Sequence, residues 1–189
     1  RLVPCAVRRP WNEAPAWGRA CAGTGRPAVG ICRKGLKLSQ GAAAWLRHQG
    51  IPTDVLEGGM VAWEAAKLPT VSVERLPPRD AQGRTVWVTR SRPKVDRIAC
   101  PWLIRRFVDP QAVFLYVAPS EVLEVAARFG ATPFDVDHAD VHWSHRGERC
   151  TFDLMVEEFG LETEPLKRLA TIVRGADTGR PELAPESAG

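Results

Sequence analysis

Short apolar runs that alternate with helical patterns constrain the fold of this chain more than any other feature. Two strands and two helices are expected in its first third: residues 28–31, 38–46, 53–56 and 60–66. Apolar side chains of the first helical segment share one face: Leu38, Ala42, Trp45 and Leu46. This spacing predicts a helix that packs on a sheet. Strands that alternate with helices predict a parallel α/β sheet, which holds its ligands at the carboxyl ends of the strands.

A cysteine, Cys32, lies between the first apolar run and the first helical segment. It is followed by three cations, Arg33, Lys34 and Lys37, and by one glycine, Gly35. Cations and unpaired helix N–H groups stabilise a thiolate, so we expect a lowered pKa and a nucleophilic sulfur. Gly35 permits a positive φ that turns successive N–H groups toward the sulfur. A buried structural cysteine is the alternative, but it does not explain the basic loop.

This loop resembles the active-site loop of the rhodanese family of sulfurtransferases, whose cysteine carries a persulfide. The resemblance covers residues 28–71 and rests on three blocks: Cys32-Arg33-Lys34-Gly35, Gln40-Gly41-Ala42-Ala43-Ala44-Trp45-Leu46 and Val55-Leu56-Glu57-Gly58-Gly59-Met60-Val61-Ala62-Trp63. It implies that Cys32 is the nucleophile and that Arg33 and Lys37 stabilise the anionic sulfur. It implies further that Lys34, Gly35 and Leu36 contact the substrate. The expected partners are a small sulfur donor and a thiol acceptor or cyanide, with no cofactor required.

The front of this first domain departs from the rhodanese pattern. Residues 3–7 favour a short strand, and Cys5-Ala6-Val7-Arg8-Arg9 resembles the first rhodanese strand, except that Ala6 stands where that family has Asp. The histidine-containing segment that usually follows is absent, and the rest of residues 1–27 is poorly patterned. We therefore expect an abbreviated rhodanese-like domain over residues 1–73. The sequence leaves open whether this domain is a catalyst or a scaffold.

A polar segment with two prolines, residues 74–84, predicts a linker and a domain boundary. Residues 85–189 then mix strand and helix patterns, which favours a mixed α/β or α+β domain. The expected strands are 85–89, 114–117 and 134–136, and the expected helices are 96–107, 120–129, 152–159 and 165–174. Asp96 is the expected N-cap of the first helix, and the inward face of the second comprises Val122, Val125, Ala126 and Phe129. The proline-containing tail from Pro181 has no packing signal, which predicts a truncated or frayed end.

The second domain resembles the C-terminal domain of the ChrB chromate-resistance proteins, from about residue 85 to the end. Four blocks carry the resemblance: Arg92-Pro93-Lys94-x-Asp96-Arg97-Ile98-Ala99-Cys100-Pro101-Trp102-Leu103-Ile104-Arg105-Arg106-Phe107, Pro133-Phe134-Asp135, His145-x-Gly147-x-x-Cys150-Thr151-Phe152-Asp153 and Ile172-Val173-Arg174-Gly175-Ala176-Asp177-Thr178. It implies a setting of chromate or related oxyanion resistance. A rhodanese unit fused to this domain is consistent with thiol chemistry near a metal oxyanion.

Six cations gather at the start of the second domain: Arg90, Arg92, Lys94, Arg97, Arg105 and Arg106. Guanidinium groups and helix N-termini suit tetrahedral dianions, so Arg92, Lys94 and Arg97 are candidate chromate ligands. Cys100, in the first turn of the predicted helix, is a candidate thiol that reduces or ligates chromium. The alternatives are a solvated helix face for the cations and a packed position for Cys100.

Residues 135–145 hold three His and three Asp, and Cys150 and Asp153 follow them. Such side chains suit zinc or another transition metal. The candidate ligands within the ChrB-like block are His145, Cys150 and Asp153. The alternative is a polar loop in which Asp153 caps the next helix. Asp177 forms either an ion pair with Arg174 or part of the same pocket.

Charge and cysteine content narrow the class of protein. The net charge of +4 is spread along the chain, which does not favour nucleic-acid binding and favours small anions instead. Five scattered cysteines without a C-x-x-C pair predict reduced thiols and a cytoplasmic location rather than a disulfide framework. No apolar run reaches the length of a membrane span. The start without Met predicts that the chain begins inside a longer reading frame.

Two functions follow from these patterns. The first is a rhodanese-type sulfurtransferase that uses a persulfide on Cys32 and is associated with chromate or oxyanion resistance. The second is a non-catalytic protein that binds or senses chromate and keeps a degenerate rhodanese scaffold. The intact Cys32 loop favours the enzyme, and Ala6 in place of Asp favours the binding protein. A DNA-binding regulator is not favoured, because no helix-turn-helix pattern with a basic recognition helix is present.

Overall fold

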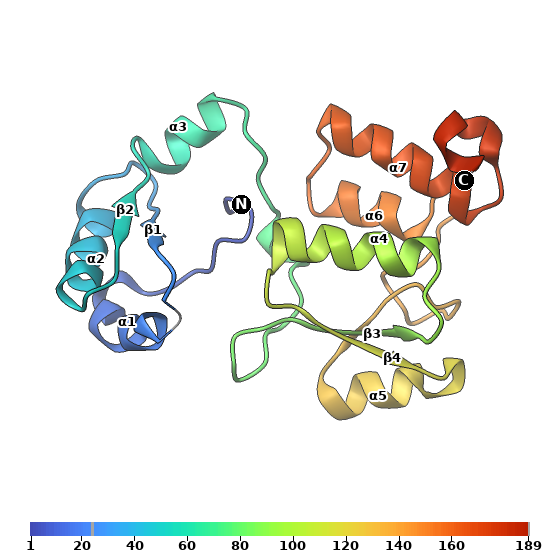
Figure 1. The fold of residues 1–189 in the computed structure, drawn as a ribbon, viewed down its shortest axis with the longest axis horizontal. Coiled ribbons are helices and arrows are strands. Elements are labelled where there is room, and N and C mark those ends of the chain that lie inside the picture. The colour runs from blue at the N-terminus through green and yellow to red at the C-terminus, as the bar shows by residue number, and fades with distance from the viewer. Residues whose placement is uncertain (24, 189) are drawn as a thin grey trace. The chain divides into compact units, whose positions relative to one another are not determined.

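The computed structural model describes residues 1–23 and 25–188, which divide into two compact units (Figure 1). The N-terminal unit comprises Leu2 and the segment from Ala6 to Pro69. The C-terminal unit comprises Arg1, Val3–Cys5 and the chain from Thr70 onward. The segment predicted as a linker, residues 74–84, therefore belongs to the C-terminal unit by its contacts. Just before it, Ser72 N–H donates a hydrogen bond to Phe159 O at 2.9 Å.

The N-terminal unit contains a two-stranded parallel sheet, in which β1 pairs with β2 and Ala28 lies opposite Thr53. The α/β alternation predicted from the sequence is present here. The elements are η1 (Trp11–Glu13), α1 (Ala14–Ala22), β1 (Ala28–Gly30), α2 (Lys37–His48), β2 (Thr53–Val55) and α3 (Gly59–Ala65). Because α2 connects the two parallel strands, the loop that holds Cys32 emerges at the carboxyl end of β1.

The buried face of α2 differs from the predicted one. Leu38 and Trp45 are 46% and 50% exposed, whereas Ala42 and Leu46 are buried as expected. The buried positions of α2 are Ser39, Ala42, Ala43 and Leu46. The prediction favoured large apolar side chains, but the neighbouring helix α1 approaches closely and leaves room for alanines. Gly18 of α1 illustrates this, since an added Cβ there would contact the Leu46 side chain at 3.0 Å.

The first 27 residues are also different from the prediction. No strand forms over residues 3–7 among the described residues, because Cys5 adopts a left-handed backbone with φ of 63°. The prediction of a strand over residues 3–7 is therefore wrong. The poorly patterned stretch instead forms α1, with Pro15 in its first turn, where the missing N–H of proline costs nothing.

The C-terminal unit is built on a three-stranded parallel sheet of order β4-β3-β5. Its strands are β3 (Val86–Arg90), β4 (Val113–Val117) and β5 (Thr132–Pro133). The third strand ends before the predicted range of 134–136, although Phe134 N–H donates to Val88 O at 3.0 Å and Phe134 forms an isolated bridge to Trp143. Since β4 and β5 flank β3 on opposite sides, the strand order reverses at β3. Ligands of α/β sheets bind in the crevice at such a switch point.

Both faces of this sheet are covered, as parallel sheets require. Trp87 packs in the larger core with Leu103 of α4, Phe152 of α6 and Phe159. The next residue, Val88, packs in a smaller core with Val122 of α5. Successive strand residues point to opposite faces, so α4, α6 and α7 lie on one side and α5 on the other (Figure 1). Phe129 does not join the inward face of α5 and is 57% exposed.

The helices of this unit match the predicted segments in number and approximate position. They are α4 (Val95–Leu103), α5 (Val122–Phe129), α6 (Thr151–Glu158) and α7 (Glu164–Asp177), with a π-helical turn, Ile104–Val108, after α4 and short 3-10 turns at Val73–Arg75, Pro119–Glu121, Pro181–Leu183 and Pro185–Ala188. Pro101 lies inside α4 and cannot donate to Arg97 O. Tyr116 OH supplies that hydrogen bond at 3.3 Å, so the helix continues through the proline.

The proline-containing tail packs on α7 and is not frayed over its described part. Ser187 Oγ donates a hydrogen bond to Ile172 O at 2.9 Å, and Ala184 is buried. Gly175 permits this contact, because a Cβ there would lie 2.8 Å from Ser187 Cβ. Among the described residues, no helix combines the length and apolarity needed to cross a membrane.

Candidate functional site

The loop after β1 surrounds the Cys32 sulfur with backbone N–H groups. Gly35 has φ of 68°, which curls the loop as predicted. The loop is fastened to the start of α3, since Met60 N–H donates to Cys32 O and Val61 N–H donates to Arg33 O, both at 3.0 Å. Gly59 permits this close approach, because a Cβ there would lie 2.5 Å from Gly35 N. The backbone of α3 thus holds the loop in shape.

Hydrogen bonds to Cys32 favour its thiolate. Burial opposes ionisation, but the Ser39 hydroxyl and the backbone N–H groups of Ser39, Lys34 and Leu36 outweigh it and lower the pKa of Cys32 to about 7. The Ser39 Oγ lies 3.1 Å from the Cys32 Sγ. A thiol with this pKa is about half ionised at neutral pH, far more than an ordinary cysteine, and is therefore a nucleophile.

The remaining residues predicted for this loop divide into backbone and side-chain roles. Lys34 and Leu36 contribute N–H groups, and their side chains are exposed. Arg33 and Lys37 are also exposed, so their cations are available to an anion in solution. Sequence reasoning missed Ser39, the buried hydroxyl in the first turn of α2. A hydroxyl at that position of the helix following a reactive cysteine is the signal that could have identified it.

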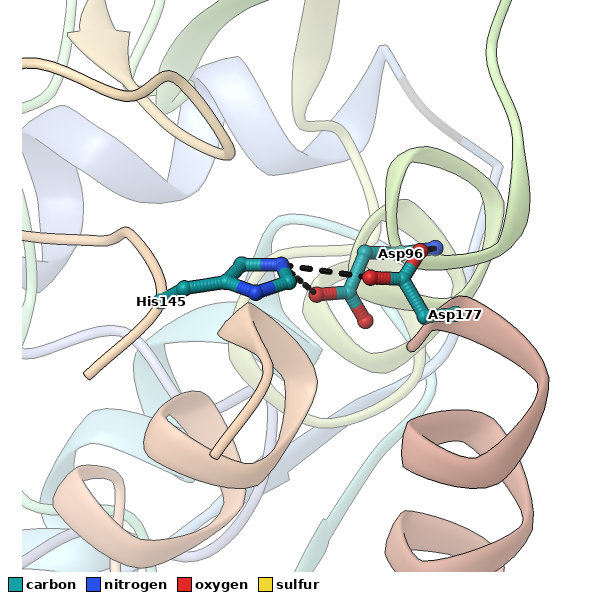
Figure 2. Close-up of side chains that lie close together, drawn as sticks. All are labelled: Asp96, His145 and Asp177. Carbon is teal, nitrogen blue, oxygen red and sulfur yellow. Dashed lines mark hydrogen bonds and ion pairs between the residues drawn. The ribbon is translucent and has the colours of Figure 1, made fainter. Parts of the chain in front are cut away.

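A second cluster lies at the switch point of the C-terminal unit, where three carboxylates converge on one imidazole. His145 Nε2 lies 3.2 Å from Asp177 Oδ2, 3.3 Å from Asp135 Oδ1 and 3.4 Å from Asp96 Oδ2. Figure 2 shows the imidazole directed at Asp96 and Asp177. Asp96 comes from the first turn of α4, Asp135 from the loop after β5 and Asp177 from the last turn of α7. One atom each of Asp96, His145 and Asp177 can ligate one metal ion, since these atoms lie within 4.8 Å of one another.

The carboxylate of Asp96 is held by the start of α6. It is completely buried and accepts hydrogen bonds from Thr151 N–H at 2.6 Å and Phe152 N–H at 3.4 Å. The N-terminus of a helix favours a negative charge. Asp96 is therefore not the N-cap of its own helix, as predicted, since Lys94 holds that position. It serves instead as the acceptor for the N-terminal amides of α6.

The carboxylate of Asp135 has its own cations. Arg90 lies 3.2 Å and Arg97 3.4 Å from Asp135 Oδ2, and the Thr151 hydroxyl donates to Oδ1 at 3.1 Å. Burial opposes ionisation of Asp135, but His145 and these two arginines outweigh it and lower its pKa. Burial raises the pKa of Asp96, and the neighbouring carboxylates add to that effect. Hydrogen bonds to Asp135, Asp177 and Asp96 raise the pKa of His145 to about 12.

The candidate chromate ligands are separated by this arrangement. Arg97 points at Asp135 and its side chain is only 11% exposed, whereas Arg92 and Lys94 are exposed to solvent. The Arg97 Nε is buried and has no hydrogen-bond partner among the described residues. Cys100 is completely buried in the larger core, and burial raises its pKa well above the ordinary value. The structure therefore places Cys100 in the packed position that sequence analysis gave as the alternative.

The three candidate metal ligands also have separate surroundings. His145 is the centre of the carboxylate cluster. Cys150 is completely buried, and burial, together with Asp96, raises its pKa, so its thiol stays neutral beside that carboxylate. Asp153 accepts a hydrogen bond from Cys150 N–H at 3.0 Å and pairs with Arg174 at 3.1 Å, which is the capping role given as the alternative. Sequence reasoning missed Asp96 and Asp135 as partners of His145, although both belong to the blocks that resemble ChrB.

Comparison with known proteins concerns mainly the C-terminal unit. The chain is 38% identical over 117 residues to Protein ChrB of Cupriavidus metallidurans, an alignment that covers 61% of this chain and 34% of that protein. The chain thus spans about a third of the length of this curated relative. No solved structure matches it. The rhodanese resemblance of the N-terminal unit stays a prediction. Residues 87–189 match the family described as ChrB, C-terminal domain, and the chain belongs to that family.

Proposed function

We propose that the N-terminal unit is a rhodanese-type sulfurtransferase and that Cys32 carries the transferred sulfur as a persulfide. The observation that carries this proposal is the loop around Cys32, in which the Ser39 hydroxyl and three backbone N–H groups face the sulfur and bring its pKa to about 7. A structural cysteine stays neutral and does not need donors around its sulfur. A nucleophilic cysteine carries negative charge on sulfur in two successive steps, and these donors stabilise that charge.

The reaction consists of two displacements at sulfur. The Cys32 thiolate attacks the outer sulfur of a donor such as thiosulfate, a new S–S bond forms, and the S–S bond of the donor breaks to release sulfite. An acceptor such as cyanide then attacks the terminal sulfur of the persulfide. The product is thiocyanate, and the bond electrons return to Cys32 as thiolate. Atoms and charge balance over the cycle, so no external oxidant, reductant or cofactor is needed.

The loop supports both steps through charge. The terminal sulfur of the persulfide is anionic. The N–H groups of Lys34 and Leu36 face the Cys32 sulfur and would stabilise the negative charge of the persulfide attached to it. The exposed cations of Arg33 and Lys37 suit a dianionic donor and the departing sulfite. Gly35 acts through the backbone alone, since it is buried and has no side chain.

The biological setting of this proposal is resistance to chromate or a related oxyanion. Membership of the ChrB C-terminal domain family supports that setting. A sulfurtransferase in the same chain would supply reduced sulfur or a thiol adduct where an oxidising oxyanion is handled. The expected partners are a small sulfur donor, a thiol acceptor and the oxyanion.

The test is sulfur transfer from thiosulfate to cyanide by the purified chain, with thiocyanate measured by its iron complex. Cys32→Ser should lower the rate by at least on the order of a thousandfold. Cys21→Ser is the matched control, because it removes another partly exposed thiol of the same unit and should leave the rate unchanged. Mass spectrometry should detect one added sulfur, roughly 32 Da, on wild-type protein treated with thiosulfate only. No turnover and no adduct would overturn the proposal.

A second candidate function, oxyanion binding without catalysis, has one observation in its favour. The Arg97 guanidinium is mostly buried beside Asp135, yet its Nε has no partner among the described residues. A guanidinium with a free donor suits a tetrahedral dianion, and the exposed cations Arg92 and Lys94 precede Arg97 closely in sequence. Equilibrium dialysis with chromate tests this function. Binding that Arg97→Lys weakens, in a chain that transfers no sulfur, would favour it over the enzyme.

A further inference from the structure

We infer that the C-terminal unit holds a divalent first-row transition-metal ion between Asp96, His145 and Asp177. The three side chains come from the first turn of α4, the loop before α6 and the last turn of α7, so the fold itself brings them together. This site lies in the other unit from Cys32 and does not depend on sulfur transfer.

Charge balance is the first argument. Asp135 is paired with Arg90 and Arg97. By contrast, none of the described lysines or arginines forms an ion pair with Asp96 or Asp177, and the only cationic partner of both is the imidazole of His145. Asp96 is completely buried, and a buried carboxylate is stable only when its charge is matched. Asp96 and Asp177 thus share one imidazolium, because both arginines of the cluster lie at Asp135. A divalent ion that displaces the His145 proton would leave a neutral imidazole as ligand and place two positive charges at these two carboxylates.

The position of Asp177 is the second argument. It is the last residue of α7, where the helix dipole is negative and disfavours a carboxylate. Its Oδ1 accepts a hydrogen bond from Asp96 N–H at 3.3 Å, so the carboxylate is held in place with Oδ2 directed at His145. The α4 amide accounts for Oδ1, whereas Oδ2 faces both the imidazole and the Asp96 carboxylate, the position from which it could ligate a cation between them.

The surroundings of the ligands match those of metal sites. The Asp96 carboxylate is oriented by the N–H groups of Thr151 and Phe152, as the ligands of metal sites are by neighbouring donors. Asp135 lies 3.3 Å from His145 Nε2 and is held by Thr151 and two arginines, so it is placed to accept a hydrogen bond from a metal-bound water. The His145 side chain is 41% exposed, which leaves the site open to solvent on one side.

The donor set decides the class of ion. Carboxylate oxygens suit Mn²⁺ and Mg²⁺, whereas an imidazole favours Fe²⁺, Zn²⁺ and Mn²⁺ over Mg²⁺. Cys100 and Cys150 are completely buried in the larger core, so neither offers a sulfur ligand at the open side of the site for a soft ion such as Cu⁺. A site of two carboxylates and one imidazole therefore suits Mn²⁺, Fe²⁺ or Zn²⁺, and Mn²⁺ is the practical probe.

The experiment titrates Mn²⁺ into the chelator-treated full chain and follows the loss of the free-ion electron paramagnetic resonance signal. Wild type should bind one Mn²⁺, and an excess of Zn²⁺ but not Mg²⁺ should displace it. Asp177→Asn and His145→Gln should each bind at least about tenfold more weakly. Asp140→Asn is the matched control, because this aspartate of the same loop region is 88% exposed and outside the cluster.

A measurement on wild type alone guards against variants that fail to fold. Added Mn²⁺ should slow hydrogen exchange at the start of α4, in the loop that holds His145 and at the end of α7. No Mn²⁺ binding by wild type would overturn the inference. The inference would also be overturned if Asp177→Asn bound Mn²⁺ as tightly as wild type does. The same holds if Mn²⁺ slowed hydrogen exchange only in other segments. None of these outcomes bears on sulfur transfer by Cys32, so the two proposals fail separately.

Discussion

The carboxylate of Asp177 accepts a hydrogen bond from the backbone N–H of Asp96, 81 positions earlier in the chain. The bond joins the last residue of α7 to the first turn of α4. Asp96 in turn accepts from the first amides of α6, so two aspartates connect the ends of three helices. His145 then faces both carboxylates, and the candidate metal site and the packing of the C-terminal unit share the same atoms.

This relationship makes Asp96 a determinant of stability even without metal. Asp96→Ala leaves the N–H groups of Thr151 and Phe152 without their acceptor and His145 without one of its carboxylates. We expect the C-terminal unit to lose about 2–4 kcal/mol of unfolding free energy, since a buried ionic partner is removed. Native-state hydrogen exchange of β3 amides in the presence of chelator measures the loss. Asp140→Ala should not change it, and an equal loss there would contradict the assignment.

Asp153 should affect stability without affecting metal. Asp153→Ala removes the hydrogen bond to Cys150 N–H and the ion pair with Arg174, so α6 loses its cap. We expect a loss of about 1 kcal/mol, the usual contribution of a helix cap. Mn²⁺ affinity should stay at the wild-type value, measured as above. A tenfold or larger loss of affinity would restore Asp153 to the ligand set predicted from the sequence.

The sequence predicted residue types of the C-terminal site better than their pairings. His145 lies in a polar cluster, as predicted, but its expected companions, Cys150 and Asp153, share its ChrB-like block and not its contacts; Asp177, for which a place in the same pocket was one alternative, does face it. Its actual neighbours, Asp96, Asp135 and Asp177, are brought to it by the crossing of α4, α7 and the loop after β5. Spacing along one segment cannot show such contacts, because they depend on the order of the strands and the packing of helices.

In the N-terminal unit, the local sequence pattern predicted the Cys32 loop but not which side of α2 is buried. The strand, the Gly35 turn and the start of α2 are set by neighbouring residues, and each was predicted. The buried face of α2 is set by α1, a helix that has no clear periodicity in sequence. Trp45 was therefore placed inside although it is 50% exposed, and Ser39 was overlooked although it is buried.

The cysteines should differ widely in reactivity. Cys32 is partly exposed with a pKa of about 7, whereas Cys100 and Cys150 are completely buried with raised pKa values. Iodoacetamide at pH 7 should therefore modify Cys32 first, and Cys100 and Cys150 only after denaturation. Peptide mass spectrometry of samples quenched over time gives the order. Modification of Cys100 in the native protein at a rate near that of Cys32 would show that the core opens readily.

The approach of α3 to the Cys32 loop should depend on Gly59. A Cβ at this position would overlap the Cys32 carbonyl oxygen, and its φ of 58° disfavours any other residue. Gly59→Ala should displace the loop, raise the pH at which Cys32 becomes reactive and speed hydrogen exchange of β1. Gly41→Ala is the matched control, since a Cβ in the middle of α2 meets no atom within 4 Å. That substitution should leave Cys32 unchanged and stabilise α2 by about 0.5–1 kcal/mol.

Ser39 should set the pH dependence of Cys32. Its hydroxyl lies 3.1 Å from both the Cys32 Sγ and the Leu36 carbonyl oxygen, and it has one hydrogen to donate. With a protonated thiol, Ser39 can donate to Leu36 O. With a thiolate, its hydrogen is drawn to the sulfur, so the hydroxyl stabilises the ionised form and helps to lower the pKa of Cys32.

In wild type, alkylation of Cys32 should thus rise with pH around a midpoint near 7 and fall below it as the sulfur becomes protonated. Ser39→Ala removes a donor to the ionised sulfur, a bond that contributes about 1.5 kcal/mol, so the midpoint should move upward and the rate at pH 7 should fall on the order of fivefold. Gly41→Ala, two positions further along α2, should keep the wild-type midpoint. Because the backbone N–H groups of Lys34, Leu36 and position 39 remain in Ser39→Ala, an unchanged midpoint would mean that these three amides stabilise the thiolate without the hydroxyl.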